Sequence, residues 1–266
     1  MYKNRIKRLI DIVLSFIALI VLLPLLAIIA LLVRVKLGSP VIFKQIRPGM
    51  KGADGKERLF TLYKFRSMND AKDDKGKLLP DEIRLTKFGE KLRAASLDEL
   101  PELWNILKGD MSIVGPRPLL VRDIVFMTAE QRNRHNVRPG LSGWAQINGR
   151  NGIKWEYKLK LDLEYIQRMS FSFDLRIILI TVKKVIKTES ITFEGMATAE
   201  DLGDHLLESG RVLETEYQQK QTEALKLCGS GSNGKIQCSD VAISKRKAGL
   251  SLPGNQQYAE SDSKTT

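Results

Sequence analysis

Residues 12–33 read IVLSFIALIVLLPLLAIIALLV, a run of 22 residues without a charged side chain. A helix of that length matches the hydrocarbon thickness of a bilayer, about 30 Å. A secretory signal peptide has a shorter apolar region and a small-residue cleavage site, whereas this run leads directly into Arg34-Val35-Lys36. The sequence therefore predicts a retained N-terminal membrane anchor over residues 1–36.

The topology of this anchor depends on its flanks and on Pro24. Basic residues lie on both sides of the run, at positions 3, 5, 7 and 8 and at positions 34, 36, 44 and 47. The positive-inside rule therefore favours the cytoplasm for both ends. Pro24 removes a backbone hydrogen bond in mid-helix and predicts a sharp kink. A helix that enters, bends and returns accounts for both features, but kinked helices that cross a membrane also tolerate proline. The residues alone leave the two topologies equally open.

The charge of the remaining chain predicts an anionic partner. The 266 residues carry a formal net charge of +12, while residues 201–266 hold eight basic and nine acidic side chains. The positive charge thus belongs to residues 1–200. It suits nucleic acid, a phosphorylated small molecule or acidic lipid, and charge alone does not choose among them.

Hydrophobic patterns predict an α/β body rich in helices. Strands are expected at 40–43 and 59–65, a polar loop at 69–81, and helices over 83–94, from 96 or 101 to 108, over 155–169 and over 174–187. The last helix is apolar with lysines at its end, which fits a buried core helix or a helix at the membrane interface. We expect the interface, because a membrane anchor is already present. Residues 228–266 lose periodicity and predict a disordered tail.

Ser96-Leu97-Asp98-Glu99 places two carboxylates side by side. The S-x-x-E pattern matches a capping box, in which Glu99 would only accept a hydrogen bond from the backbone amide of Ser96. The alternative is an anion or metal site, because free amides at a helix start favour phosphates and carboxylates. A hard cation held by Asp98 or Glu99 remains open. Two histidines and no Cys/His cluster argue against a transition-metal site or a histidine triad.

Two further segments could bind phosphate. In Val114-Gly115-Pro116-Arg117-Pro118 the prolines make either a rigid turn with a solvated arginine or a pre-positioned guanidinium. Residues 138–150, RPGLSGWAQINGR, combine three glycines with two arginines and predict a loop whose backbone approaches a ligand closely.

These motifs, in this order and together with Tyr63–Met68 (YKFRSM) and Leu107–Ser112 (LKGDMS), closely resemble the bacterial sugar transferase family over residues 1–200. Its members are the monotopic phosphoglycosyl transferases, and the chain is most similar to the small members that consist of a catalytic unit alone. The resemblance implies a helix-rich α/β fold that is membrane-embedded and monotopic. Its parts would be a re-entrant helix over residues 1–36, a cytosolic catalytic domain with interfacial amphipathic helices over 37–200, and an extension over 201–266 that is disordered from about 228. Many members have Ser-Pro at the bend, whereas this chain has Leu23-Pro24.

The resemblance also implies an activity. A sugar 1-phosphate, expected to be that of an N-acetylated amino sugar, would pass from a UDP-sugar to undecaprenyl phosphate with release of UMP. This is the first membrane step of glycoconjugate synthesis, on the cytoplasmic face of the bacterial inner membrane. By analogy Asp98 is the nucleophile and the ligand of Mg²⁺, and Glu99 positions or deprotonates the acceptor phosphate. The residues that match phosphate- or nucleotide-binding positions are Lys64, Arg93, Arg117 and Arg150.

The implied partners are inner-membrane lipid, further copies of the chain and downstream glycosyltransferases, but not nucleic acid. Two other functions are weighed. One is a glycosyltransferase that moves only the sugar and releases UDP, against which the lack of a D-x-D motif argues. The other is a non-enzymatic, basic module that binds a membrane surface.

Overall fold

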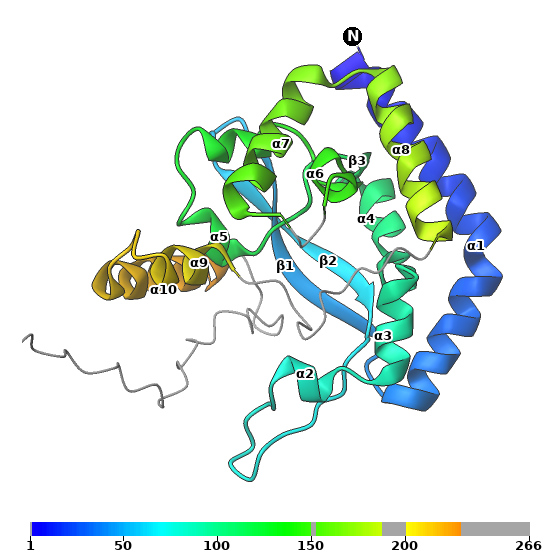
Figure 1. Ribbon diagram of the computed structural model, residues 1–266. Coiled ribbons are helices and arrows are strands. Elements are labelled where there is room, and N and C mark those ends of the chain that lie inside the picture. The colour runs from blue at the N-terminus through cyan, green and yellow to red at the C-terminus, as the bar shows by residue number, and fades with distance from the viewer. Residues whose placement is uncertain (1, 150–152, 188–200, 230–266) are drawn as a thin grey trace, which may run out of the picture.

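The computed structural model describes residues 2–149, 153–187 and 201–229 (Figure 1). Its helices are α1 (Lys7–Leu37), α2 (Asp81–Arg84), α3 (Lys87–Ala94), α4 (Glu102–Lys108), α5 (Val121–Ile124), α6 (Trp144–Ile147), α7 (Trp155–Arg168), α8 (Phe171–Ile186), α9 (Leu202–Glu208) and α10 (Glu214–Gly229). Shorter turns are the π-helix Tyr2–Ile6 and the 3-10 helices Leu97–Glu99 and Gln131–Asn136. The predicted helix-rich α/β class is confirmed.

Two small sheets of two strands each lie between the helices (Figure 1). Strand β1 (Ile42–Lys51) is antiparallel to β2 (Glu57–Phe65), and β3 (Ser112–Val114) is parallel to β4 (Gly140–Ser142). In the first sheet Lys44 lies opposite Tyr63, and Phe43 opposite Lys64. Strand β1 is longer than the predicted segment 40–43, because β2 pairs with it as far as Lys51.

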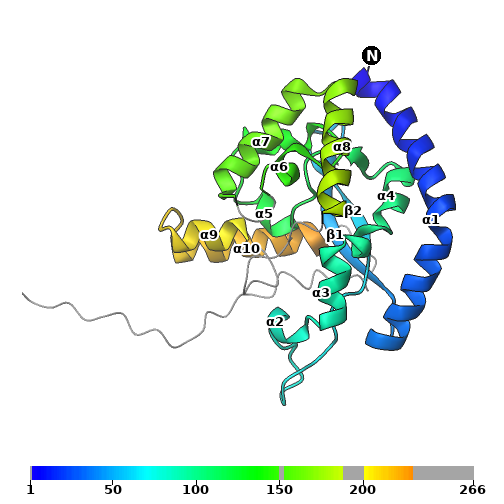
Figure 2. The ribbon, with the colours of Figure 1, turned by 45° about the vertical axis from the view of Figure 1, so that its right-hand side comes forward.

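Helix α1 continues through Pro24 and is bent near its middle, with the concave side toward the rest of the protein (Figures 1 and 2). A bend is the expected result of a proline inside a helix, and here it takes the form of a bend in a continuous helix where a sharp kink was predicted. By its length and composition α1 could cross a membrane. Its outward side chains are apolar and exposed, among them Phe16, Ile20, Val21, Leu23, Ile28, Leu31 and Val35.

The inner face of α1 contacts the body along its whole length. Near its start, the Lys7 Nζ atom lies 2.6 Å from Asp174 Oδ2 in α8. The Asp11 carboxylate accepts hydrogen bonds of 3.0 Å from the Ser112 hydroxyl and the Ile113 amide. The middle packs against β2 and α4, and the end packs against β2 and α3 through apolar side chains, namely Ala18, Leu19 and Leu22 and then Leu26, Ile29, Ala30, Val33 and Leu37. Anchor and body thus form one packed unit.

Two helix boundaries differ from those predicted. The helix expected over 83–94 is divided into α2 and α3, because Leu85 is extended and Thr86 begins a new helix by accepting a 3.1 Å hydrogen bond from the Gly89 amide. The helix expected from 174 begins at Phe171, because the Ser170 hydroxyl caps it. The predicted loop 69–81 contains a bridge between Lys72 and Leu78.

Helices α9 and α10 belong to the C-terminal extension and pack against α5. The Phe126 and Tyr217 ring centroids are 5.6 Å apart, and Asp123 accepts a 3.0 Å hydrogen bond from the Leu202 amide. The extension is therefore part of the folded body as far as Gly229. The tail predicted to be disordered lies, from residue 230 onward, outside the described residues.

Candidate active site

Asp98 and Glu99 lie in the 3-10 helix Leu97–Glu99, between α3 and α4. The predicted capping box is absent: Ser96 has a left-handed backbone conformation, with φ of 55°, and its side chain makes no capping hydrogen bond. On either side of the two acids, Leu97 and Leu100 pack into the core beside α1. Because the leucines take the core-facing positions, the carboxylates face the basic side chains of β2 and of the loop after β3.

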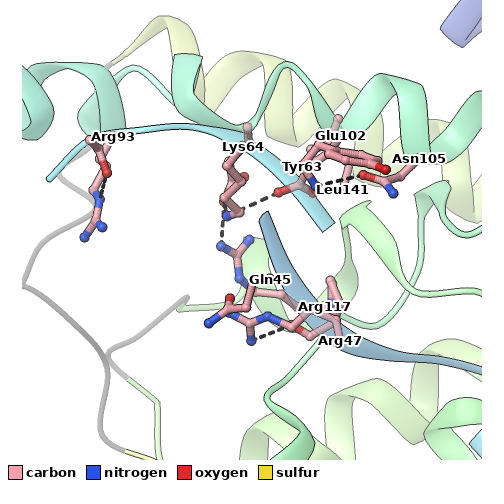
Figure 3. A network of polar contacts seen from close by, with 12 residues as sticks. Gln45, Arg47, Tyr63, Lys64, Arg93, Glu102, Asn105, Arg117 and Leu141 are labelled. Atoms are coloured by element: carbon pink, nitrogen blue, oxygen red, sulfur yellow. Dashed lines mark hydrogen bonds and ion pairs between the residues drawn. The ribbon is translucent and has the colours of Figure 1, made fainter. Parts of the chain in front are cut away.

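Glu99 is held by two cations from different parts of the chain. Its Oε1 atom lies 2.7 Å from Lys64 Nζ in β2 and 2.6 Å from Arg117 Nη2 in the loop after β3. Figure 3 shows Lys64 and Arg117 reaching toward each other from opposite sides of the site. Burial alone would raise the pKa of Glu99, but the charges of Arg117 and Lys64 outweigh burial and hold the pKa well below its usual range. Glu99 is therefore a carboxylate at neutral pH.

Asp98 is buried beside Glu99, and no described side chain pairs with it. Its residue surface is 7% exposed. Its carboxylate makes no hydrogen bond or ion pair within the part of the chain that the structure describes. Burial raises the pKa of Asp98; the charge of Lys64 opposes this rise, and the charge of Glu99 adds to it. Asp98 is thus a poorly solvated carboxyl group beside several cations, and it is available to a ligand.

Arg93 lies in the last turn of α3. In Figure 3, Lys64 lies between Arg93 and Glu102. Its Nε atom donates a 2.9 Å hydrogen bond to the Ser67 hydroxyl. Burial lowers the pKa of Arg93, and the charge of Asp98 opposes that shift. The structure therefore brings together three of the four predicted basic residues around the two acids. The fourth, Arg150, lies outside the described residues.

The predicted Mg²⁺ has one possible ligand here. Among residues 2–149, 153–187 and 201–229, no group of three or more His, Cys, Asp or Glu side chains is arranged to hold a metal ion. Mg²⁺ in proteins commonly uses one or two carboxylates and completes its shell with water and substrate phosphates. The Asp98 carboxylate, which no described side chain engages, suits that type of binding, and Mg²⁺ stays a prediction.

Comparisons with known proteins identify the family. The model of a family described as bacterial sugar transferase matches residues 2–188. The chain belongs to this family. The resemblance seen in the sequence is thereby confirmed.

Several curated relatives are similar to this sugar transferase. A Bacillus subtilis sugar transferase named EpsL is 55% identical over 168 residues, which are 63% of this chain and 81% of that protein. The UDP-glucose:undecaprenyl-phosphate glucose-1-phosphate transferase of Escherichia coli is 43% identical over 192 residues, which are 68% of this chain and 40% of that protein. A UDP-N-acetylgalactosamine-undecaprenyl-phosphate N-acetylgalactosaminephosphotransferase of Aeromonas hydrophila is 35% identical over 193 residues, which are 68% of this chain and 44% of that protein. The chain spans less than half the length of the last two relatives.

Sequence reasoning missed Glu102 of this sugar transferase. Glu102 is 2% exposed, and its Oε1 atom lies 3.2 Å from Lys64 Nζ. Burial raises the pKa of Glu102 to about 7; the Lys64 charge opposes this rise, and the Glu99 charge adds to it. A usable signal was its position three residues after Glu99, because residues at that spacing share one face of a helix.

Two glycines of the segment 138–150 have a structural role. A Cβ atom on Gly143 would lie 2.2 Å from the Gly115 carbonyl oxygen, and one on Gly140 would lie 2.0 Å from the Gly115 nitrogen. Within the described residues, these two glycines let the segment that starts at Arg138 pack backbone to backbone against the loop that carries Arg117. These two glycines serve packing within the chain, and the approach of a ligand to this loop stays a prediction.

Proposed function

We propose that this protein transfers a sugar 1-phosphate from a UDP-sugar to undecaprenyl phosphate and releases UMP. The names of the E. coli and A. hydrophila relatives support this reaction class. The single observation that carries the proposal is the contrast between the two acids. Glu99 is engaged by Lys64 and Arg117, whereas the Asp98 carboxylate next to it is not engaged by any described side chain.

In the first step an Asp98 carboxylate oxygen attacks the sugar-bearing phosphorus of the donor. The new oxygen–phosphorus bond forms as the bond to the bridging diphosphate oxygen breaks, and UMP leaves with that electron pair. A carboxylate nucleophile divides one difficult displacement into two easier ones. In the second step a phosphate oxygen of undecaprenyl phosphate attacks the same phosphorus, and the Asp98 carboxylate is regenerated.

Lys64, Arg93 and Arg117 supply fixed positive charge where both phosphates must meet. Preorganised cations in a partly dry site stabilise the developing charge of phosphoryl transfer. The low pKa of Glu99 makes it a weak base. We therefore assign Glu99 to positioning the acceptor phosphate through its two cations rather than to removing a proton. Mg²⁺ bound at Asp98 would neutralise charge on the diphosphate.

We further propose that α1 is re-entrant and that the body lies on the cytoplasmic face of the inner membrane. The body contacts α1 from Lys7 to Leu37, so a straight span would draw the body into lipid. The exposed outer face of the bent helix is apolar and suits lipid. Basic flanks at both ends favour the cytoplasmic side.

A covalent intermediate on Asp98 is the direct test. The donor alone should leave a phosphosugar adduct on position 98, detected by mass spectrometry. Donor and undecaprenyl phosphate together should release UMP. Asp98→Asn should abolish both, with the fold intact, because asparagine has nearly the same shape and the Asp98 carboxylate makes no described hydrogen bond or ion pair that the change would remove. Asp54→Asn, in the β1–β2 turn, is the matched control and should keep full activity.

The same assay separates the other functions. Release of UDP instead of UMP would contradict phosphosugar transfer and indicate transfer of the sugar alone. Membrane binding that depends steeply on salt, with no turnover and no effect of Asp98→Asn, would indicate a non-enzymatic membrane module. A panel of UDP-sugars, including UDP-N-acetylhexosamines, identifies the donor. The glycoconjugate that follows, downstream glycosyltransferases and self-association are further expectations of this proposal.

A further inference from the structure

Arg117 lies on a segment whose own structure is not regular. Residues 115–120 connect β3 with α5. The Arg117 side chain is 42% exposed and meets Glu99 at its far end. With so much of the side chain in solvent, the direction of its guanidinium depends on how firmly the backbone of this segment is held.

Arg134 holds that backbone from inside the protein. Its residue surface is 2% exposed. Its Nε and Nη2 atoms donate hydrogen bonds of 2.9 and 2.8 Å to Asp162 Oδ2 in α7. Nη2 also donates a 2.6 Å hydrogen bond to the Arg117 carbonyl oxygen, and Nη1 lies 3.2 Å from His135 Nε2. One guanidinium thus joins α7 to the backbone of the proposed substrate-binding loop.

Stability alone does not account for this buried ion pair. Removing two charges from water costs several kcal/mol per ion, and apolar side chains of similar volume often stabilise a core equally well. What Arg134 and Asp162 provide, and an apolar pair would not, is a directed donor at the Arg117 carbonyl.

A second guanidinium holds the next carbonyl of the same loop. Arg47 Nη1, from β1, donates a 3.3 Å hydrogen bond to the Pro118 carbonyl oxygen. The Nη2 atom of Arg47 donates a hydrogen bond to the side-chain oxygen of Gln45. Figure 3 shows Arg47 and Gln45 beside Arg117, on the side of the site opposite Lys64. Because Pro116 and Pro118 already restrict φ, fixing two successive carbonyls leaves the Arg117 backbone little freedom.

We propose that Arg134, anchored by Asp162, is a positioning residue for Arg117. It holds the Arg117 carbonyl so that the guanidinium faces Glu99 and the diphosphate of the donor. This inference rests on the proposed function only for the identity of that ligand.

The first test is Arg134→Lys. A lysine ammonium keeps the charge next to Asp162 but lacks the planar fork that serves Asp162 and the carbonyl together. We expect about a tenfold higher KM for the UDP-sugar in the UMP assay, the equivalent of one lost hydrogen bond. Arg132→Lys is the matched control: Arg132 lies on the same 3-10 helix but pairs with Glu57 in β2. The KM of the Arg132→Lys variant for the UDP-sugar should equal that of wild type.

Two readouts separate positioning from a general loss of structure. In a protein that already carries Arg117→Ala, adding Arg134→Lys should not raise the KM for the UDP-sugar further, because Arg134 acts through Arg117. Amide hydrogen exchange in the peptide covering residues 114–120 should be faster in Arg134→Lys than in wild type, and unchanged in Arg132→Lys. If Arg134→Lys does not fold, Arg134→Met combined with Asp162→Leu removes both charges and keeps apolar volume, with the same expected effects.

The proposal would be overturned by an unchanged exchange rate in that peptide, or by a KM effect that adds in full to that of Arg117→Ala. The exchange measurement needs no substrate. A wild-type protein that releases no UMP would therefore contradict the proposed function, while the exchange rates would still decide whether Arg134 holds the loop.

Discussion

Lys64 is the cation that two glutamates of the site share. Its ammonium lies 2.7 Å from Glu99 and 3.2 Å from Glu102, so two buried carboxylates share one cation. Glu99 has Arg117 as a second partner, whereas the described contacts of Glu102 include Lys64 as its only ion pair. Glu102 is therefore the carboxylate that protonates first as the pH falls toward 7.

This difference predicts opposite pH dependences for two isosteric variants. The Glu102 pKa of about 7 exceeds that of an unfolded glutamate, near 4.3, so the folded state binds more protons between these values. The contribution of Glu102 to the unfolding free energy then falls as the pH rises through this window. Glu102→Gln should equal wild type in stability at pH 4.5 and exceed it by about 1–3 kcal/mol at pH 8, measured by chemical denaturation in detergent.

Glu99→Gln is the opposite case. The pKa of Glu99 is depressed, so its ion pairs add stability above the unfolded pKa and lose it as the pH falls. Glu99→Gln should therefore be less stable than wild type at pH 8, and the difference should shrink toward acid pH. The same pH dependence in both variants would contradict the assigned charge states.

At the residue scale, the structure brings Asp98, Glu99, Lys64 and Arg117 together, as expected for residues of one site, and their roles stay predictions. Of the two interpretations of Ser96–Glu99, the capping box is not formed, and the pattern alone does not show that Ser96 takes a left-handed backbone conformation. Arg134 and Asp162 were not recognised. Their pairing joins segments 28 residues apart in sequence, and no local pattern reports it.

At the scale of elements, the two loops of the site depend on glycine for their contact. A Cβ on Gly143 would lie 2.2 Å from the Gly115 carbonyl oxygen, which is backbone and cannot rotate away. Gly143→Ala should destabilise the protein by about 1–3 kcal/mol, as overpacking does, and should lower UMP release by displacing Arg117. Gly52→Ala, whose Cβ would meet only the ends of the flexible Asp54 and Arg58 side chains, should change little. Equal thermal unfolding midpoints for both variants would contradict this account.

Helix and strand positions were predictable wherever one face repeats at a regular spacing, as over α7 and α8. The division between α2 and α3 was not, because Thr86 acts as a cap only once Leu85 turns away. For α1 the sequence showed the apolar run and Pro24. It could not show that the inner face packs on β2, α3 and α4, since these contacts belong to the tertiary fold.

At the scale of the whole molecule, the bent anchor predicts that both of its ends lie on one side of the membrane. A cysteine in place of the exposed Arg5, and another in place of the exposed Lys56, should both react with a membrane-impermeant maleimide in inside-out vesicles. Neither should react in right-side-out vesicles. Labelling of position 5 from the outside would indicate a helix that crosses the membrane.

The packing of α9 and α10 on the body predicts how far the C-terminal end can be shortened without loss of stability. A chain ending at Gly229 keeps α9 and α10 and should match the full chain in thermal unfolding midpoint and UMP release. A chain ending at residue 200 exposes Phe126 and Trp155, which the extension covers. It also removes the Leu202 amide from the buried Asp123 carboxylate. Its midpoint should fall by several degrees. A stable, active chain ending at residue 200 would show that the extension is only an appendage.

The inner face of α1 has a consequence for biosynthesis. Helix α1 is translated before the body residues that bind its Lys7 and Asp11 side chains. The partners of Asp11 follow 101 and 102 residues later, and that of Lys7 follows 167 residues later. Until then the partners open to these two groups are water, lipid headgroups and each other. Because burying them in lipid without the body would be costly, we expect the start of the helix to stay at the bilayer surface. We therefore expect the anchor to reach its final depth only after α8 has been translated.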